Sequence, residues 1–461
     1  SKAPVILNSA GTVSPVVETS VTLTENIPAS GVVAFDDGAS SPQLPSLAWD
    51  SADTGKFVII TDDQNNSRAG VARVGTVTGT GGSQTFTYGN STVWSSSQAY
   101  PYAIAACPNN DGKFLVIFAD DNSVSPDTSM EAYGVVIQIS GTIVTVGTKF
   151  LLGWNLGQGE ERGNAQLVAD PFVANQFVFA SAELTTHDGY MQVIRLTAGA
   201  TTTMVSVSTP VEWVDTPGDY IYKPCIAADP LTAGRFLIAD RDITNGSYPT
   251  AWPITLSGTT LTSYTNTVQA SKSTNYCGIG YTGITAGEFV IVYKGTSSGS
   301  DEDMWGSVGQ TSSSQVITFA NVPVSQGGLN ESSDEHAFTA MGGSSGKFFL
   351  LMAQATGLAL KVNVGTVASG ALTWGTQSQP NSATYSGAKV ALAANSQNLG
   401  GVVVAYDYST QCNAYVSDVG GTYVYPSNLT ATNFIGISDA AILDTASGNV
   451  TIKGGIAATG L

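Results

Sequence analysis

The chain has 461 residues and a formal net charge of −18, and only 11% of its residues are charged, well under the ~25% typical of soluble domains. The acidic excess, 35 Asp plus Glu against 17 Lys plus Arg, repels a nucleic-acid backbone and excludes nucleic-acid binding. No apolar run approaches the ~18 residues that a membrane span needs, so we expect no membrane insertion.

The N-terminal segment gives two expectations. The chain opens "SKAPVILN" without an initiator methionine or a signal-peptide pattern and ends abruptly at "GGIAATGL", which suggests a fragment or a processed product. Further on, "VVAF" at residues 32–35 resembles "STVW" at 91–94 and "VEW" at 211–213. Both of those segments follow a predicted fourth strand, so we predict that residues 32–35 complete the outer strand of the last repeat. The alternative is an irregular N-terminal arm.

Copies of one short phrase recur along the rest of the chain. The phrase reads "GKFVII" around Phe57 and "GKFLVI" around Phe114, and related phrases follow at intervals of 53 to 63 residues. These later copies are centred on Phe177, Phe236, Phe289, Phe348 and, in a degraded form, Val402. Repetition at such a period is typical of a supersecondary unit that cannot bury its apolar face alone.

Each repeat predicts four strands. A first strand rich in small residues ends at Asp50 in the first repeat, and the "GKFVII" strand, a third strand such as "GVARVGTV" and a fourth such as "QTFTYG" follow. No segment shows a sustained 3.6-residue period. Four short antiparallel strands per unit favour a β-propeller blade over a parallel β-helix. Small residues suit the converging first strands, namely Ala103, Ala105, Ala106, Ala227 and Ala228.

The sequence therefore predicts an all-β fold, a seven-bladed β-propeller of four-stranded antiparallel blades with a short C-terminal β module. We expect an N-terminal arm at residues 1–31, the propeller at 32–432, and the C-terminal module at 433–461, truncated where the sequence stops.

The four cysteines form no metal-binding spacing such as C-x-x-C. Cys225 and Cys277 fall in the predicted first strands of neighbouring repeats, where a disulfide is geometrically conceivable. We prefer buried free thiols, because cysteines scattered so widely make no disulfide framework.

Acidic residues recur where the second strand ends, as Asp62 with Asp63 and Asp120 with Asp121, and also as Asp240, Asp242 and Asp407. On a propeller these positions share one face, and oxygen-rich loops suit Ca²⁺, so the first four residues are metal candidates; no other cofactor is expected. The alternative is that Asp and Asn side chains bond nearby backbone N–H groups and shape the turns. The lack of an EF-hand spacing favours this alternative.

We expect no catalytic residues and predict that the chain is not an enzyme. Only six arginines and no Asp-box turn are present, which disfavours a sialidase, and His187 and His336 lie in different repeats without a G-x-S-x-G motif. Aromatic residues in or near loops could stack on sugar rings, although most aromatic residues in a propeller wedge between blades. These residues are Tyr100, Tyr102, Trp154, Tyr190, Tyr220, Tyr222, Tyr248, Trp252 and Trp305. The segment "GDYIYKP" makes Tyr220 and Tyr222 the binding candidates.

Three phrases, "PVILNSAGTVSPVVETS", "GVARVGTVTGT" and "NFIGISDAAILDTASGNVTIKGG", carry a resemblance. The chain from Pro4 to Gly455 resembles the repeat-containing tail-fibre and virion structural proteins of marine bacteriophages. It departs from them where later repeats lack a "VGTVSG" phrase, apart from "VGTVASG" at 364–370, and where the family's "GLTPG..YY" segment is missing.

The resemblance implies a virion-surface or extracellular protein without a catalytic motif. Its expected role is host attachment through a cell-surface glycan or protein, with other virion proteins as partners and an oligomeric state compatible with such an assembly. The alternatives are a purely structural part that decorates or stabilises the particle or an extracellular assembly, a cellular surface or filament protein, and a carbohydrate-degrading propeller enzyme.

Overall fold

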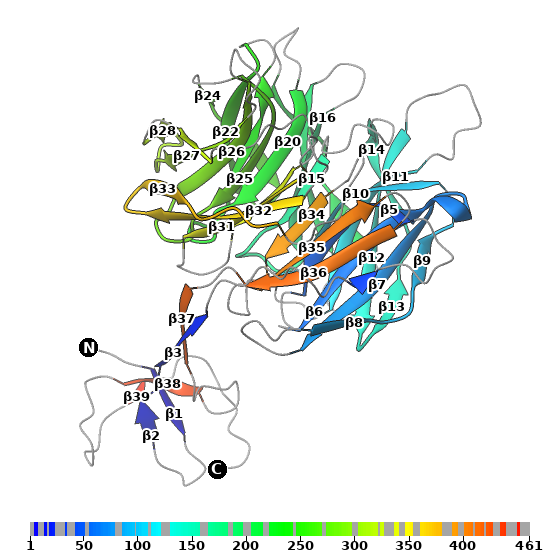
Figure 1. The fold of residues 1–461 in the computed structure, drawn as a ribbon, viewed down its shortest axis with the longest axis horizontal. Coiled ribbons are helices and arrows are strands. Elements are labelled where there is room, and N and C mark those ends of the chain that lie inside the picture. Colours follow the sequence, from blue (N-terminus) through cyan, green and yellow to red (C-terminus); the bar gives the residue numbers. More distant parts are fainter. Residues whose placement is uncertain are drawn as a thin grey trace. The chain divides into compact units, whose positions relative to one another are not determined.

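The structure is a computed structural model, and in the part of the chain that it describes it contains β-strands and one short 3₁₀ helix (Figure 1). The described residues are 4–7, 13–15, 18–23, 33–34, 42–50, 55–78, 85–96, 98–108, 112–120, 130–156, 165–182, 188–196, 204–214, 221–242, 246–269, 273–296, 303–320, 323–326, 336–340, 346–353, 360–379, 390–394, 401–408, 411–418, 421–426, 434–438 and 450–451.

The chain divides into two compact units. The larger unit covers residues 24–420, and the smaller one combines 1–23 with 421–461. In the smaller unit the two ends of the chain pair: β1 (Pro4–Leu7) lies between β2 (Val13–Pro15) and β38 (Phe434–Ser438), and β38 also pairs with β39 (Val450–Thr451). A second antiparallel pair joins β3 (Glu18–Leu23) to β37 (Gly421–Pro426).

This division differs from the one made on the sequence, which treated 1–31 and 433–461 as separate segments. The physical reason is that an isolated strand leaves its backbone N–H and C=O groups unpaired, and each terminal strand satisfies them on the other. The pairing joins segments at least 398 residues apart, for which the local sequence carries no signal.

The larger unit contains consecutive antiparallel sheets, which we number 1 to 7 along the chain. Sheet 1 comprises β5 (Pro42–Trp49), β6 (Lys56–Asp63), β7 (Ala69–Thr78), β8 (Thr85–Tyr88) and β9 (Thr92–Ser95), with the 3₁₀ helix η1 (Gln64–Asn66) after β6. Sheet 2 comprises β10 (Ala99–Ala106), β11 (Lys113–Asp120), β12 (Met130–Ser140), β13 (Ile143–Val146) and β14 (Phe150–Leu156). Sheet 3 comprises β15 (Ala165–Ala169), β16 (Gln176–Ala182), β17 (Gly189–Leu196), β18 (Met204–Val207) and β19 (Val211–Val214).

The later sheets repeat this order. Sheet 4 comprises β20 (Ile221–Ala228), β21 (Arg235–Asp242), β22 (Tyr248–Ser257), β23 (Thr260–Ser263) and β24 (Thr267–Val268). Sheet 5 comprises β25 (Ser273–Tyr281), β26 (Glu288–Thr296), β27 (Asp303–Thr311), β28 (Ile317–Phe319) and β29 (Val324–Ser325). Sheet 6 comprises β30 (His336–Ala340), β31 (Lys347–Ala353), β32 (Leu360–Ala368) and β33 (Ala371–Trp374). Sheet 7 comprises β34 (Val390–Ala394), β35 (Gly401–Tyr408), β36 (Gln411–Asp418) and β4 (Val33–Ala34).

The outer strand of sheets 1 to 5 is divided, whereas the sequence predicted a single fourth strand. In sheet 1, β7 pairs with β8 through Gly75 and Tyr88, and with β9 through Gly70 and Ser95. The third strand is longer than either outer piece, so two short strands in succession satisfy its free edge. The "STVW" segment is therefore part of the outer strand.

Sheet 7 takes its outer strand from the N-terminal side of the chain. Ala34 pairs with Asn413 and Val33 with Ala414, which confirms the prediction for residues 33–34; Val32 and Phe35 lie outside the described residues. The indole Nε1 of Trp49 in sheet 1 donates to the carbonyl oxygen of Ala393 in sheet 7 at 3.0 Å. Sheets that are distant in sequence are thus hydrogen-bonded neighbours.

The first strands of successive sheets lie against one another. In order, the contacting pairs are β5 with β10, β10 with β15, β15 with β20, β20 with β25, β25 with β30, β30 with β34, and β34 with β5. The alanines predicted for converging strands lie in β10 and β20, where Ala103, Ala105 and Ala227 are buried. Larger side chains would collide where strands converge in this way.

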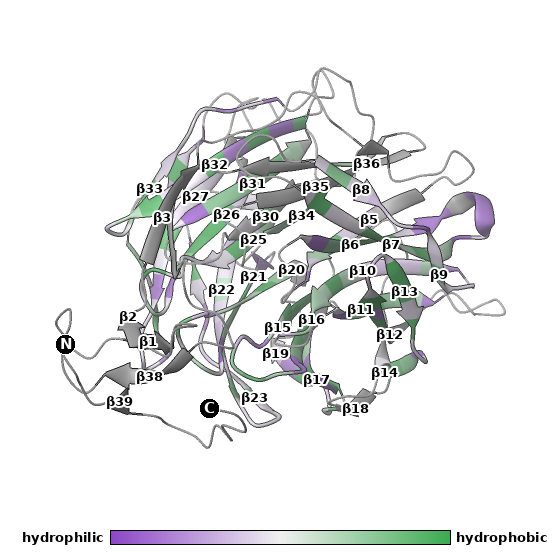
Figure 2. Cartoon of the chain, turned by 90° about the horizontal axis from the view of Figure 1, so that it is seen from below, coloured by the Kyte–Doolittle hydropathy of each residue, from purple (hydrophilic) through white to green (hydrophobic). Residues whose placement is uncertain are grey.

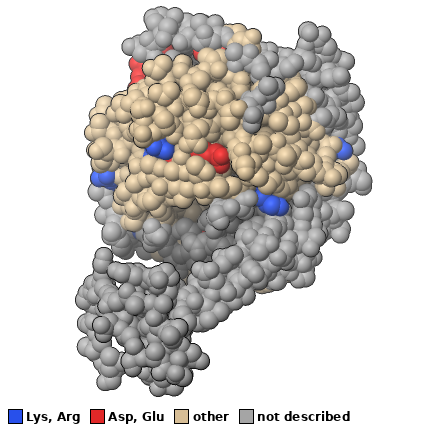
Figure 3. All heavy atoms as spheres, turned by 90° about the vertical axis from the view of Figure 1, so that its left-hand side faces the viewer, with Lys and Arg blue, Asp and Glu red and all other residues tan. Residues whose placement is uncertain are grey.

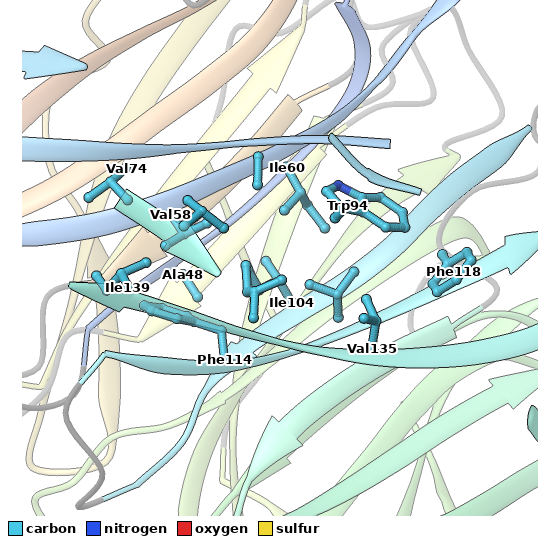
Figure 4. Close-up of a cluster of buried hydrophobic side chains, with 14 of the residues drawn as sticks. Ala48, Val58, Ile60, Val74, Trp94, Ile104, Phe114, Phe118, Val135 and Ile139 are labelled. Carbon is cyan, nitrogen blue, oxygen red and sulfur yellow. The ribbon is translucent and has the colours of Figure 1, made fainter. Parts of the chain in front are cut away.

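Apolar layers between neighbouring sheets form the core. Between sheets 1 and 2, Val58 and Ile60 pack against Ile104 and Phe114, and Trp94 packs edge-on against Phe118 with ring centroids 4.8 Å apart (Figure 4). Figure 2 shows hydrophobic residues along the strands of the sheets. Because the second strand is covered on both faces, its aromatic residue, such as Phe57 or Phe289, is fully buried.

The larger unit is therefore an all-β assembly of four-stranded antiparallel sheets packed face to face, the architecture of a β-propeller.

Candidate functional site

The antiparallel strands give every sheet of the larger unit two ends, which differ in the connections they carry. At the turn end, the first strand passes to the second and the third to the outer strand. At the loop end, the second strand passes to the third, and the outer strand passes to the first strand of the next sheet. Among the described candidates, Asp62, Asp63 and Asp120 end second strands and Tyr222 lies at the start of a first strand, so these four fall at the loop end.

The turn between the first and second strands has the same length in all sheets. Six residues separate the two strands each time, namely 50–55, 107–112, 170–175, 229–234, 282–287, 341–346 and 395–400. The last turn residue has a positive φ in sheets 2 to 6, as at Gly112 (69°), Asn175 (60°) and Gly287 (82°). Its carbonyl accepts a hydrogen bond from the third strand, as in Ile139 N–H to Gly112 O at 2.6 Å. The last turn residue thus has the same conformation in sheets 2 to 6.

Carboxylates at the start of these turns join neighbouring sheets. Asp50 of sheet 1 is buried and accepts from the backbone N–H of Gly112 in sheet 2, at 3.2 Å to Oδ1 and 3.1 Å to Oδ2. Asp229 of sheet 4 accepts from Gly287 of sheet 5 at 2.9 Å. Asp229 also forms a buried ion pair with Arg235 at 3.3 Å. Each carboxylate ties its own turn to the next sheet.

Sheet 2 uses a thiol at the same position. Cys107 is buried and its Sγ donates to Oδ1 of Asn175 in sheet 3 at 2.9 Å. Burial raises the pKa of the Cys107 thiol to about 11, so the group stays protonated at neutral pH and can donate. A carboxylate in sheets 1 and 4 and a thiol in sheet 2 therefore both form a hydrogen bond to the next sheet at the turn end.

Connections at the loop end vary in length. Between second and third strands they range from two residues (409–410) to nine (121–129). Between the outer strand and the next first strand they range from three (96–98) to fifteen (375–389). At the turn end the inner turns are constant and the turns between third and outer strands range from two residues (141–142) to seven (197–203), so the repeats differ most at the loop end.

Two loop-end arrangements each combine a buried carboxylate, a partly exposed cation and a tyrosine ring. In the first, Arg68 Nη1 lies 3.5 Å from Oδ2 of Asp62, whose side chain is fully buried, while 35% of the Arg68 side chain is exposed. The guanidinium carbon lies 4.9 Å from the ring centre of Tyr100 in sheet 2, a cation–π distance. Arg68 has φ 57°, and its carbonyl accepts from Ala99 N–H at 2.9 Å.

The second arrangement is in sheet 2. Lys149 forms an ion pair with the buried carboxylate of Asp120 and lies 4.7 Å from the ring centre of Tyr133. The Tyr133 hydroxyl donates to Oε2 of Glu131 at 2.6 Å, and this bond, more than burial, raises the pKa of Tyr133 to about 12. Lys149 is 42% exposed. The N–H of Ala99 donates to Arg68 of the first arrangement, and Ala99 is the strand partner of Asp120 of the second arrangement. Both arrangements therefore meet in sheet 2.

The metal candidates have other contacts in the structure. Asp62 and Asp120 are buried beside cations, and Asp63 Oδ1 accepts from Asn65 N–H at 3.1 Å, the turn-shaping contact that was the alternative. Asp121 lies outside the described residues. Among the residues that the structure describes, no group of three or more His, Cys, Asp or Glu side chains is arranged to hold a metal ion.

The tyrosine candidates are only partly placed. Tyr222 lies in β20 and pairs with Arg241 at the loop end of sheet 4, although its side chain is outside the described part of the structure. Tyr220 also lies outside it. Asp240 and Asp242, which end the second strand of the same sheet, are buried.

Sequence reasoning missed the cations. Arg68 lies five residues after Asp63, and in a chain with so few basic residues this closeness was an available signal. Lys149 is 29 residues from Asp120, so only the fold reveals their pairing. Among the described residues on the face drawn in Figure 3, charged side chains are sparse.

No protein-family model and no curated protein matches this chain. Among solved structures, a lectin mutant of Aleuria aurantia in complex with Fucα1-6GlcNAc is 12% identical, with a TM-score of 0.42, and the match covers 76% of this chain and 99% of the lectin. A periplasmic gluconolactonase of Pseudomonas aeruginosa is 12% identical, with a TM-score of 0.46 and coverage of 83% and 98%. An α-L-arabinanase of Penicillium chrysogenum is 13% identical, with a TM-score of 0.41 and coverage of 87% and 99%.

No helix within the described residues is long and apolar enough to cross a membrane. The lectin, gluconolactonase and arabinanase activities belong to those proteins. Similarity at these identities and TM-scores shows nothing about the activity of this chain.

Proposed function

We propose that this chain is a seven-bladed β-propeller that acts in attachment, presenting its loop end to a glycan or protein on a cell surface, without catalysis. Three observations support the blade count: the first strands contact one another in sequence from β5 to β34, β34 contacts β5, and Val33–Ala34 supplies the outer strand of sheet 7. A ring completed by strands from both sides of the chain would leave only short sheet edges for unwanted pairing.

The observation that carries the function is the contrast between the ends of the sheets. At the turn end every inner turn has six residues and the outer turns have two to seven, whereas the connections at the loop end range from two residues to fifteen. The end with the less varied connections suits a scaffold, and the end with the more varied connections suits recognition, since loops positioned by a rigid scaffold carry binding disproportionately.

The chemistry of the loop end suits a polar ligand such as a glycan. Arg68 and Lys149 are each held by a buried carboxylate and by a tyrosine ring, so they are pre-oriented while their exposed parts face solvent. Pre-orientation lowers the entropy cost of binding. A guanidinium or ammonium beside an aromatic ring can bond sugar hydroxyl or carboxylate groups.

We place the protein on a virion surface or in another extracellular assembly, with other virion proteins as partners. Weak single contacts are sufficient there, because several copies on one particle raise avidity without new contacts. The sparse surface charge and the resemblance to tail-fibre and virion proteins support this setting.

The test is binding of the purified chain to a glycan array and to whole cells in sea-salt buffer, with and without EDTA. We expect binding that is weakened in Arg68→Gln and Lys149→Gln variants. The matched control is Ile143→Thr, which changes a 70% exposed residue at the turn end and should leave binding unchanged.

The other outcomes select other roles. Loss of binding in EDTA would assign recognition to a cation in the loops. Absence of binding by a chain shown to be folded and in its native oligomeric state would favour a purely structural role. Turnover of a polysaccharide would overturn the non-enzymatic proposal.

A further inference from the structure

Two cysteines from neighbouring sheets meet in the interface between sheets 4 and 5. Cys225 lies in β20 and Cys277 in β25, and their Sγ atoms are 3.8 Å apart, although the residues are separated by 52 positions in the sequence. Both are free thiols in the structure. This contact is independent of the loop-end arrangements and of the proposed function.

Strand alternation directs both side chains into the same apolar layer. Cys225 and Ala227 are two positions apart in β20, so they share the face toward sheet 5. Cys277, Ile279 and Tyr281 likewise alternate in β25 and face sheet 4. All five residues belong to one packed cluster, so the thiols are held opposite each other by the sheets that carry them.

The two thiols differ in access. Cys277 is buried, with 7% of the residue exposed, whereas Cys225 is only partly buried. The Cys225 thiol also lies 3.2 Å from the carbonyl oxygen of Ala239, its partner in β21. Burial, followed by the neighbouring Cys225 thiol, raises the pKa of the Cys277 thiol well above its ordinary value. A reagent in solution would therefore meet Cys225 first.

We propose that Cys225 and Cys277 are a disulfide-forming pair that covalently joins the first strands of sheets 4 and 5 when a small-molecule disulfide such as oxidised glutathione is present. A disulfide needs sulfur atoms about 2.0 Å apart, and rotation of side chains already in contact supplies the approach. The pair then acts as an oxidation-dependent cross-link between neighbouring sheets.

The reaction is two thiol–disulfide exchanges. The Cys225 thiolate attacks one sulfur of the small disulfide, whose S–S bond breaks; one small thiol leaves, taking a proton, and a mixed disulfide forms on Cys225. Cys277 gives up its proton and attacks Sγ of Cys225, the mixed disulfide breaks, and a second small thiol leaves. Two protein thiols are oxidised, and one small disulfide is reduced to two small thiols.

The cross-link restricts the unfolded chain by closing a loop of 52 residues, and stabilisation from such closure grows with loop length. We expect the oxidised chain to have a Tm about 2–5 °C above that of the reduced chain. Reduction should reverse the shift.

The test uses the whole folded chain, incubated with oxidised glutathione and then alkylated and digested without reduction. We expect one peptide that joins Cys225 to Cys277 and is lighter by two hydrogens than the sum of its parts. Cys225→Ser should abolish both this peptide and the Tm shift. Cys107→Ser is the matched control, because Cys107 is also buried in a sheet interface but lies against Asn175, and this variant should keep both.

The proposal would be overturned if the wild-type chain, still folded by circular dichroism, kept both thiols open to alkylation once unfolded after the incubation. It would also be overturned if the joined peptide paired either cysteine with a different partner. Because the first readout needs no substitution, a variant that fails to fold does not affect the result.

Discussion

The turn end and the loop end of the sheets use buried carboxylates in different ways. At the turn end, Asp50 and Asp229 accept hydrogen bonds from the backbone of the next sheet, so the carboxylates are part of the packing between sheets. At the loop end, Asp62 and Asp120 hold a cation whose side chain is 35% or 42% exposed. The same residue type therefore supports stability at one end and presents charge at the other.

Asp229→Ala is the strongest test of this difference between the turn end and the loop end. The change removes the acceptor for Gly287 N–H and leaves the guanidinium of Arg235 buried, with its side chain only 9% exposed. We expect a loss of about 3–5 kcal/mol of unfolding free energy, because a buried cation loses its partner. Urea unfolding monitored by tryptophan fluorescence measures the change.

The loop-end control for that experiment is Asp63→Ala, which removes one turn-shaping bond to Asn65. We expect a cost of about 1 kcal/mol, since the hydrogen bond to Asn65 is exposed and local. Equal costs for the two variants would show that the turn end has no special role in stability.

A second test concerns the backbone of the inner turns. At Gly287, φ is 82°, and an added Cβ would overlap the carbonyl oxygen of Thr311, which Gly287→Ala would push away from its sheet. Gly258→Ala is the matched control, because φ there is 63° but the added Cβ meets nothing within 4 Å. We expect the Gly287 variant to lose about 2–3 kcal/mol and the control about 1 kcal/mol. Thermal unfolding measures both, and equal losses would contradict the steric explanation.

Much of the fold could be predicted from the sequence, because the repeat carries local signals. The period, the small residues of the first strands and the likeness between residues 32–35 and "STVW" specified the sheets and the strand that completes sheet 7. Pairing of the chain ends through β1 and β38 was not predictable, since neither segment shows which distant edge it will complete.

The candidate site was less predictable than the fold. The acidic strand ends were found, but their roles depend on burial and on partners that the fold brings close, such as Lys149 beside Asp120. The hydrogen bond from Gly112 N–H to Asp50 joins residues 62 positions apart. The recurring Asp therefore indicated a position in the repeat but not the group that bonds to it.

A third test uses pH. Burial, with a further contribution from the nearby Asp229 carboxylate, raises the pKa of the Tyr281 phenol. In the unfolded chain tyrosine ionises near pH 10, so the stability from keeping Tyr281 neutral is fully present below pH 10 and is lost as pH rises toward the folded-state pKa. We expect unfolding free energy to fall by about 1.4 kcal/mol per pH unit above pH 10 on account of this group.

Substituting one tyrosine at each end of the sheets shows which of them causes the loss of stability at alkaline pH. Tyr281→Phe at the turn end should flatten the alkaline slope. Tyr133→Phe at the loop end should change the slope less, although the pKa of Tyr133 is also raised, because that ring is partly exposed and water screens its charge. Unfolding curves between pH 9 and 11 compare the variants, and a larger effect at Tyr133 would reverse the assignment of the buried end.

The smallest expected effect on stability lies at the proposed binding surface. Arg68 forms a partly exposed ion pair with Asp62 and a cation–π contact with Tyr100, so Arg68→Gln should cost under about 1 kcal/mol of unfolding free energy. Binding to cells or glycans should nevertheless fall, because the exposed guanidinium is lost. Arg68→Lys, which keeps the charge but not the planar donor group, should recover only part of the binding. A variant with native binding and lowered stability would instead assign Arg68 to the scaffold, and the loop end would then differ from the turn end only in the length of its connections.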